Sequence, residues 1–264
     1  MLRDVWTKTL WDQRRSLLGW AIGFAVVSLI YASFYPVAAT PEYEEIIGRM
    51  PPGFVDAFGW EDISSPYGYL GSTVYGLLGS VLIAVMAIGL GARAIAGSEE
   101  DGSLEMLISM PVTRTKVVVH KSIALLFATF TAAVVVFIAV LAIREPLDLD
   151  IPLANLAAAS LNLALLGALF GTFAILIGSI VGKKGLAIGA GASAAVFAFL
   201  VDGLAPQLDS IAWMQKLSPF YWYDATGTLK EGLAPAMTLL LAGVTIVFAI
   251  AAIATFNRRD VLGR

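Results

Sequence analysis

Six long apolar runs, separated by polar segments, dominate the pattern along the chain. The runs cover residues 16–35, 69–96, 122–143, 153–181, 186–201 and 234–256. An α-helix needs about 20 mostly apolar residues to cross a hydrocarbon core of about 30 Å. The first run is longer than the apolar core of a usual signal peptide, so we interpret it as a retained span. The pattern predicts an all-α integral membrane protein with six transmembrane helices in a single transmembrane domain, residues 1–264.

The basic residues between the runs indicate which loops face the cytoplasm. Cytoplasmic loops of membrane proteins carry an excess of Lys and Arg. Thirteen of the 17 basic residues fall in every second polar segment, namely 1–15, 93–121, 182–185 and 257–264. The distribution therefore predicts a multi-pass protein with both termini in the cytoplasm.

Composition narrows the possible functions. The chain has 264 residues, of which 58% are hydrophobic and 14% charged, with a mean hydropathy of +0.82 and a net charge of −3. A soluble domain carries about 25% charged residues, so an ordinary soluble enzyme is excluded, and the net charge argues against a nucleic-acid partner. There is no Cys and a single His, His120. A cysteine nucleophile, a disulfide or a two-His metal site within one chain is therefore excluded.

Two further absences from the sequence bear on energy coupling. No G-x-x-x-x-G-K-[ST] phosphate loop is present, so the chain does not itself hydrolyse ATP by that route. No charged residue lies deep inside a predicted span, which disfavours an ion-coupled carrier, since such carriers usually bury carboxylates or His.

Residues 1–15 have an amphipathic pattern ahead of the first apolar run. One helical face holds four apolar residues, Leu2, Val5, Trp6 and Leu10. The cations, Arg14 among them, lie mostly away from that face. The pattern predicts an interfacial helix on the inner leaflet. It fits a simple positively charged anchor or a brace for a cytosolic partner.

The segment between the second and third runs predicts a short cytosolic helix. Glu99 and Glu100 suit its first turn, Gly102 interrupts it, and Pro111 ends it. An apolar stripe follows the i, i+3, i+4 spacing of one helical face, with Leu104, Leu107 and Ile108. Such a helix either docks in a groove of a soluble partner or packs on its own bundle, and the spacing does not decide between them.

Two regions suggest local packing devices. Small residues lie four apart in the fourth and fifth runs, Gly167 with Gly171 and Gly185 with Gly189, a spacing that lets membrane helices approach closely. The outer segment 206–232 is rich in aromatic residues and is interrupted by Pro219. It predicts either short helices dipping into the outer leaflet or a plain aromatic belt at the headgroup level.

Three stretches resemble the permease subunits of ABC-2-type ABC transporters. The segment 100–114, Glu-Asp-Gly-Ser-Leu-Glu-Met-Leu-Ile-Ser-Met-Pro-Val-Thr-Arg, is similar to the coupling segment of that family. The segment 217–223, Leu-Ser-Pro-Phe-Tyr-Trp-Tyr, and the segment 256–260, Phe-Asn-Arg-Arg-Asp, add weaker matches. Length, number of spans and orientation agree as well, so the resemblance covers the whole chain.

The resemblance implies a fold like that of type V exporters and gives the segments roles. The start of the chain would be an elbow helix formed by Leu2, Val5, Trp6, Leu10 and Arg14. The coupling helix would dock on an ATPase through Glu99, Glu100, Gly102, Ser103, Leu104, Glu105, Leu107, Pro111 and Arg114. Outer re-entrant helices would contain Trp213, Pro219, Phe220, Tyr221 and Trp222.

The function implied by the resemblance is that of the permease subunit of an ATP-driven exporter. Two permease copies, identical or closely related, would combine with two separate ATPase subunits in a bacterial plasma membrane and contact its lipids. ATP and Mg²⁺ would bind to the ATPase, with no cofactor in this chain. The low charge of the spans suggests an amphiphilic substrate (a drug, peptide or lipid) along spans one, two and five. An ion-coupled carrier and a non-transporting membrane scaffold remain the alternatives.

Overall fold

The computed structural model describes residues 5–104 and 112–259, and every regular element within these ranges is a helix. Six helical stretches are long and apolar enough to cross a membrane: Trp11–Ala38, Pro66–Glu100, Arg114–Arg144, Leu153–Val181, Lys184–Gln207 and Pro235–Arg258. The predicted all-α fold with six spans is confirmed. The fourth span has the predicted bounds, and the other five extend beyond the apolar runs at one end or both.

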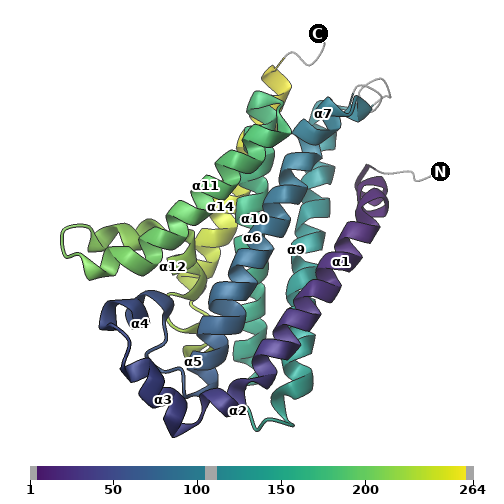
Figure 1. The fold of residues 1–264 in the computed structure, drawn as a ribbon. Helices are drawn as coiled ribbons and strands as arrows, with labels where there is room; N and C mark the ends of the chain where they lie inside the picture. The colour runs from purple at the N-terminus through teal and green to yellow at the C-terminus, as the bar shows by residue number, and fades with distance from the viewer. Residues whose placement is uncertain (1–4, 105–111, 260–264) are drawn as a thin grey trace.

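The six spans lie side by side with their axes roughly parallel (Figure 1). They are built on α1 (Val5–Ser33), α6 (Ser80–Ala92), α9 (Arg114–Arg144), α10 (Leu153–Val181), α11 (Lys184–Leu204) and α14 (Pro235–Arg258). Helix α10 is central and packs against α6, α9, α11 and α14, while α1 packs mainly on α9. The most apolar windows of α1, α11 and α14 are only 17%, 22% and 22% buried. These three helices therefore leave apolar faces for lipid or for another protein.

The second span is continuous but not uniformly α-helical. Following the predicted orientation, we call the end of the bundle at α5 the outer end and the end at α7 the inner end. From the outer end the second span consists of α5 (Pro66–Leu70), the π-helix η1 (Gly71–Gly79), α6, the π-helix η2 (Arg93–Gly97) and α7 (Ser98–Glu100). A π-helix has i→i+5 hydrogen bonds and wider turns than an α-helix, and short π-helical segments occur frequently at functional sites. Here η2 lies directly before the predicted coupling segment.

Short helices cover the end of the bundle opposite α7 (Figure 1). After the first span come α2 (Tyr35–Ala38), α3 (Pro41–Gly48) and α4 (Pro52–Phe58). Between α11 and α14 lie the 3₁₀ turns η3 (Ala205–Gln207) and η4 (Ala212–Leu217), then α12 (Pro219–Asp224) and α13 (Thr228–Glu231). Helices α3, α4, α5, α12 and α14 each begin with Pro, whose fixed φ suits the first helical position.

Close helix approach depends on glycine in the fourth span. A β-carbon at Gly171 would lie 2.6 Å from Leu125 Cδ2 of α9, and one at Gly167 would lie 2.8 Å from Ile83 Cγ1 of α6. Both distances are well below van der Waals contact, so any larger residue would force these side chains or the helices that carry them to shift. The predicted packing role holds for this pair. Gly185 and Gly189 have no atom within 4 Å of the same position, so they face away from the rest of the chain.

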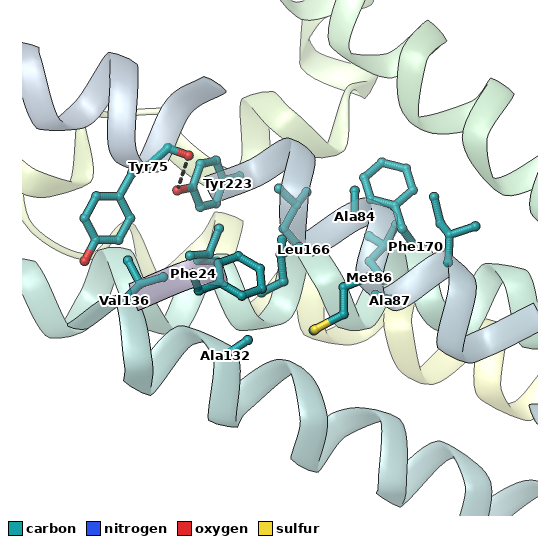
Figure 2. Close-up of a cluster of buried hydrophobic side chains, with 14 of the residues drawn as sticks. Phe24, Tyr75, Ala84, Met86, Ala87, Ala132, Val136, Leu166, Phe170 and Tyr223 are labelled. Atoms are coloured by element: carbon teal, nitrogen blue, oxygen red, sulfur yellow. Dashed lines mark hydrogen bonds between the residues drawn. The ribbon is translucent and has the colours of Figure 1, made fainter. Parts of the chain in front are cut away.

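Polar groups in the core fix α12 into the bundle. The Tyr223 hydroxyl donates to the backbone carbonyl of Tyr75 in η1 at 3.1 Å (Figure 2). Asn162 Nδ2 donates to the Tyr223 carbonyl at 3.0 Å, and Asn162 Oδ1 accepts from Thr238 Oγ1 at 2.9 Å. Asn162 thereby joins α10, α12 and α14, as expected for an interhelical polar residue in the fourth span.

The start of the chain differs from the expectation of a separate amphipathic helix over residues 1–15. Helix α1 begins at Val5 within the described residues and runs unbroken to Ser33. No Pro or Gly lies between Val5 and Leu18 to interrupt it, and a continuous helix keeps every backbone group hydrogen-bonded as the chain enters the apolar region. Arg14 lies on this helix, with its guanidinium carbon 4.1 Å from the centre of the Trp11 ring. The structure does not describe Leu2 or the side chains of Val5, Trp6 and Leu10.

Candidate transport groove and coupling end

A groove of about 540 Å³ follows the face formed by α1, α6 and α11. Its walls are almost entirely apolar, and the aromatic residues among them are Trp20, Phe199 and Phe220. Trp20 comes from α1, Phe199 from α11 and Phe220 from α12. The groove therefore lies along the three spans that were predicted to line a pathway.

A polar cavity of about 480 Å³ adjoins the outer end of the groove. It is lined by four carboxylates, Asp56, Asp62, Asp202 and Asp224, and by a single cationic residue, Lys230. Asp202 lies near the outer end of α11, beyond the fifth apolar run predicted from the sequence, and its Oδ1 atom is buried without a hydrogen-bond partner within the described residues. The outer cavity thus has more carboxyl groups than cations.

Phe199 and Phe220 line both the groove and the outer cavity. Their rings meet edge to face, with centroids 5.4 Å apart and an interplanar angle of 82°. Phe220 is held in place because Ser218 Oγ donates to the Ala198 carbonyl at 2.9 Å and accepts from the Phe220 backbone N–H at 3.1 Å. This aromatic pair forms the boundary between the apolar and acidic parts of the path.

A second polar cavity, of about 370 Å³, adjoins the opposite end of the groove. Arg93 of η2 and Lys184 of α11 line both this cavity and the groove. The other charged residues around the inner cavity are Asp12, Asp101 and Lys121. Three cavities therefore follow one another along the same face, from a polar inner end through an apolar middle to an acidic outer end.

A network of polar contacts joins the ends of five spans at the side of α7. Glu99 forms an ion pair with Arg259, and their side chains are only 29% and 20% exposed. Arg259 Nη1 also donates to the carbonyl of Ser179 at 3.0 Å, and the Arg259 carbonyl accepts from Arg114 Nη1 at 2.5 Å. Arg259 thus connects α7 with the end of α10 and the start of α9, directly after α14.

Two more contacts extend this network. Glu100 Oε1 accepts from the backbone N–H of Lys184 at 2.9 Å and so satisfies a free donor at the start of α11. The buried Lys121 of α9 donates from Nζ to Ser98 Oγ at 2.5 Å. A displacement of residues 98–100 would therefore be transmitted through these contacts to α9, α10, α11 and the end of α14.

Comparison with known families gives one match over nearly the whole chain. The model of the ABC-2 family transporter protein matches residues 5–261. The chain belongs to the ABC-2 transporter family. It is a membrane permease subunit of an ABC transporter, in a family whose transmembrane subunits are generally non-catalytic and associate with an ABC ATPase. Comparison with curated protein sequences gave no match.

Eight of the nine coupling residues predicted for this ABC-2 permease fall into three groups, and Leu104 is described separately below. Glu99, Glu100 and Arg114 meet in the network of polar contacts around Arg259. Gly102 has a φ of 70°, which fits the predicted interruption of the helix, and Ser103 Oγ donates to the Ser98 carbonyl at 3.2 Å. Three predicted residues lie outside the described ranges: Glu105, Leu107 and Pro111.

Leu104 does not present the free apolar face that the prediction allowed. Its side chain is fully buried and belongs to the hydrophobic core of the bundle. Between the two alternatives left open by the spacing, Leu104 follows the one in which the segment packs on its own bundle. Its contribution to any docking surface is therefore indirect, through the position of the segment.

The outer residues predicted for the permease do not act as a single belt. Phe220 is buried, Tyr221 lines the outer cavity, and Trp222 Nε1 donates to the Lys216 carbonyl at 2.7 Å. Pro219 begins α12, so the predicted break of the helix lies immediately before it. Trp213 is exposed. Short helices are present as predicted, and their position relative to the bilayer stays a prediction.

Two functional candidates of the permease were not singled out from the sequence. Arg259 was only part of a weak terminal resemblance, because its partner Glu99 is 160 residues away. Phe199 lies in an apolar run without any local signal. The aromatic content of residues 217–223 pointed to the neighbourhood of Phe220 but not to its ring contact.

Proposed function

We propose that this permease forms half of the membrane pathway of an ATP-driven exporter that moves an amphiphilic substrate outward. The observation that carries the proposal is the series of three adjoining cavities along α1, α6 and α11. An apolar middle section holds the apolar part of a substrate, and the polar ends receive and release it. The Phe199–Phe220 pair acts as the outer gate.

The proposal assigns a second permease copy to the open side of the groove. The exposed faces of α1 and α11 carry large apolar side chains, including Ile22, 63% exposed, and Val196, which lines the groove and is 59% exposed. Lipid can cover such faces, but a second copy packed on them would close the groove into a pathway between the two chains. Gly185 and Gly189 on α11 would permit close approach of that copy.

The energy source in this proposal is a separate ATPase subunit that holds ATP and Mg²⁺. It would dock beside residues 98–114, and its closure on ATP would displace that segment. The contacts of Glu99 and Glu100 would carry the displacement into α9, α10, α11 and the end of α14. The groove would then open toward the acidic outer cavity.

The first experiment is purification of the tagged permease from its own membrane in a gentle detergent, with mass identification of every comigrating protein. A stoichiometric ATPase subunit with a phosphate loop is the expected result. A chain that runs alone after chemical crosslinking would overturn the proposal. Transport driven by an ion gradient without ATP would then favour the carrier alternative.

A second experiment tests the arrangement of two permease copies. The sequence has no Cys, so single-Cys variants need no cysteine-free background. Differently tagged Ile22→Cys and Val196→Cys chains, expressed together, should crosslink to each other. Leu239→Cys on α14, 71% exposed, replaces Ile22→Cys as the control. Equal crosslinking through α14, or none through α1 and α11, would contradict the proposed contact.

A further inference from the structure

We propose that the inner end of the groove binds the anionic headgroup of a membrane amphiphile whose chain lies along the groove. The inference rests on the proposed function, because it names the substrate class for the same pathway. The headgroup would contact Arg93 and Lys184, and the substrate would enter from the inner leaflet.

Arg93 and Lys184 converge on one point between the second and fifth spans. They are the only charged residues that line both the groove and the inner cavity within the described part of the chain. A β-carbon at Gly97 would lie 3.5 Å from Arg93 Cγ and 3.6 Å from Lys184 Cδ. Both side chains therefore pass over the same glycine.

The carboxylates beside these cations have other partners or line only the inner cavity. Glu99 is paired with Arg259, and Glu100 accepts from the backbone N–H of Lys184. Asp12 and Asp101 line the inner cavity but not the groove. Over residues 5–104 and 112–259, neither the Arg93 guanidinium nor the Lys184 ammonium forms an ion pair or side-chain hydrogen bond. Two cations at the mouth of an apolar groove are complementary to an anion that carries an apolar chain.

The length of the groove suits the chain of one lipid leaflet. Along α6 the lining extends from Arg93 to Val81. Twelve residues of helix correspond to about 18 Å at a rise of about 1.5 Å per residue. One leaflet of a hydrocarbon core of about 30 Å is about 15 Å deep. A chain anchored at Arg93 would thus lie along the apolar walls through the depth of its own leaflet.

The charges along the path also favour an anion at its inner end and disfavour it at its outer end. The inner end of the groove presents two cations, while the outer cavity presents four carboxylates and one lysine. An anionic headgroup that passed the Phe199–Phe220 pair would meet charges of its own sign and would be released. A cationic amphiphile would have the opposite preference and would be held at the outer end.

Quenching of Trp20 fluorescence provides a direct test, because Trp20 lines the groove. The full permease is placed in phosphatidylcholine vesicles that contain a minor fraction of brominated-chain lipid. That lipid is either anionic phosphatidylglycerol or zwitterionic phosphatidylcholine. The difference between the wild type and Trp20→Phe isolates quenching inside the groove from quenching at other tryptophans.

We expect phosphatidylglycerol to be preferred in the groove by about fivefold for each of the two cations, the equivalent of about 1 kcal/mol per basic residue near an anionic lipid. Arg93→Gln and Lys184→Gln should each reduce the preference for phosphatidylglycerol about fivefold. Arg93→Lys should retain most of that preference. Lys183→Gln is the matched control, since this exposed neighbour lines neither cavity. Equal quenching by both lipids, or an equal loss in the control, would overturn the headgroup site.

The same variants separate a substrate from a resident lipid. The quenching assay needs neither nucleotide nor ATPase, so its result is independent of whether the chain proves to be an ATP-driven exporter. In vesicles that also contain the ATPase, ATP should deplete fluorescent phosphatidylglycerol from the cytosolic leaflet, and Arg93→Gln should slow this at least fivefold. Coupled ATP hydrolysis without lipid movement, together with intact binding, would overturn the substrate assignment.

Discussion

The Glu99–Arg259 ion pair should measurably stabilise the end of the permease that carries α7. Replacing Arg259 by Gln removes the charge opposite Glu99 and weakens the bonds to the carbonyls of Gly178 and Ser179. Truncating one partner of a fully buried pair costs about 3–5 kcal/mol, and a fully exposed pair contributes about 0–1 kcal/mol. Because the two side chains are 20% and 29% exposed, we place the loss between these limits, at about 2 kcal/mol.

Thermal unfolding in detergent, followed by the loss of soluble permease, measures this loss. A change of about 2 kcal/mol corresponds to a fall in apparent Tm of about 4–8 °C for a chain of this size. Arg258→Gln is the matched control, because Arg258 is exposed and its side chain forms no ion pair or hydrogen bond within residues 5–104 and 112–259. Its apparent Tm should change by less than about 1–2 °C, as expected for an ordinary surface substitution.

A double-mutant cycle then tests the pairing itself. If Glu99 and Arg259 interact as the structure indicates, Glu99→Gln should cost little in the Arg259→Gln background. The coupling energy should be about 1–2 kcal/mol, in the range measured for residues in direct contact. Additive effects, or a loss in Arg258→Gln as large as in Arg259→Gln, would refute the reasoning.

Three further predictions concern the gate, the packing and the orientation of the permease. Phe220→Ala removes a buried ring at the outer gate and should lower stability by about 3–5 kcal/mol; the permease–ATPase complex should also hydrolyse more ATP per substrate moved, and an unchanged apparent Tm would contradict the gate packing. Gly171→Ala should destabilise by about 1–3 kcal/mol through its clash with α9, whereas Gly243→Ala on α14, which has open space, should not; equal apparent Tm values would refute the packing argument. Ser103→Cys should react with a membrane-impermeant maleimide only in inside-out vesicles and Glu61→Cys only in intact cells, and reversed labelling would invert the orientation.

The sequence by itself determined the class of the protein and the number of its spans. The cost of leaving backbone and charged groups in hydrocarbon forces apolar runs to become helices, and this rule depends only on local composition. The run 153–181 therefore gave the bounds of α10 without correction. The sequence also predicted the acidic helical turn at Glu99 and Glu100 and the interruption of the helix at Gly102. Both features depend on local conformation and capping, which follow from residue type.

Contacts between distant segments were decided only by the tertiary structure. Leu104 had the spacing of a docking face, but whether it faces a partner or its own core depends on which helices surround it. The unbroken α1 was likewise hidden, since an amphipathic pattern fits both an interfacial helix and the end of a span.

The groove and the polar network beside α7 depend on the same kind of long-range arrangement. Arg259 pairs with Glu99, which lies 160 residues earlier in the chain. The ring of Phe199 in α11 contacts the ring of Phe220 in α12. The side chains of Arg93 and Lys184, from two different spans, both pass over Gly97. Hydropathy records the solvent that each residue prefers, whereas these contacts depend on how whole helices pack. The sequence could therefore predict the spans, and only their packing brought together the residues that form the groove, the Phe199–Phe220 pair and the polar network beside α7.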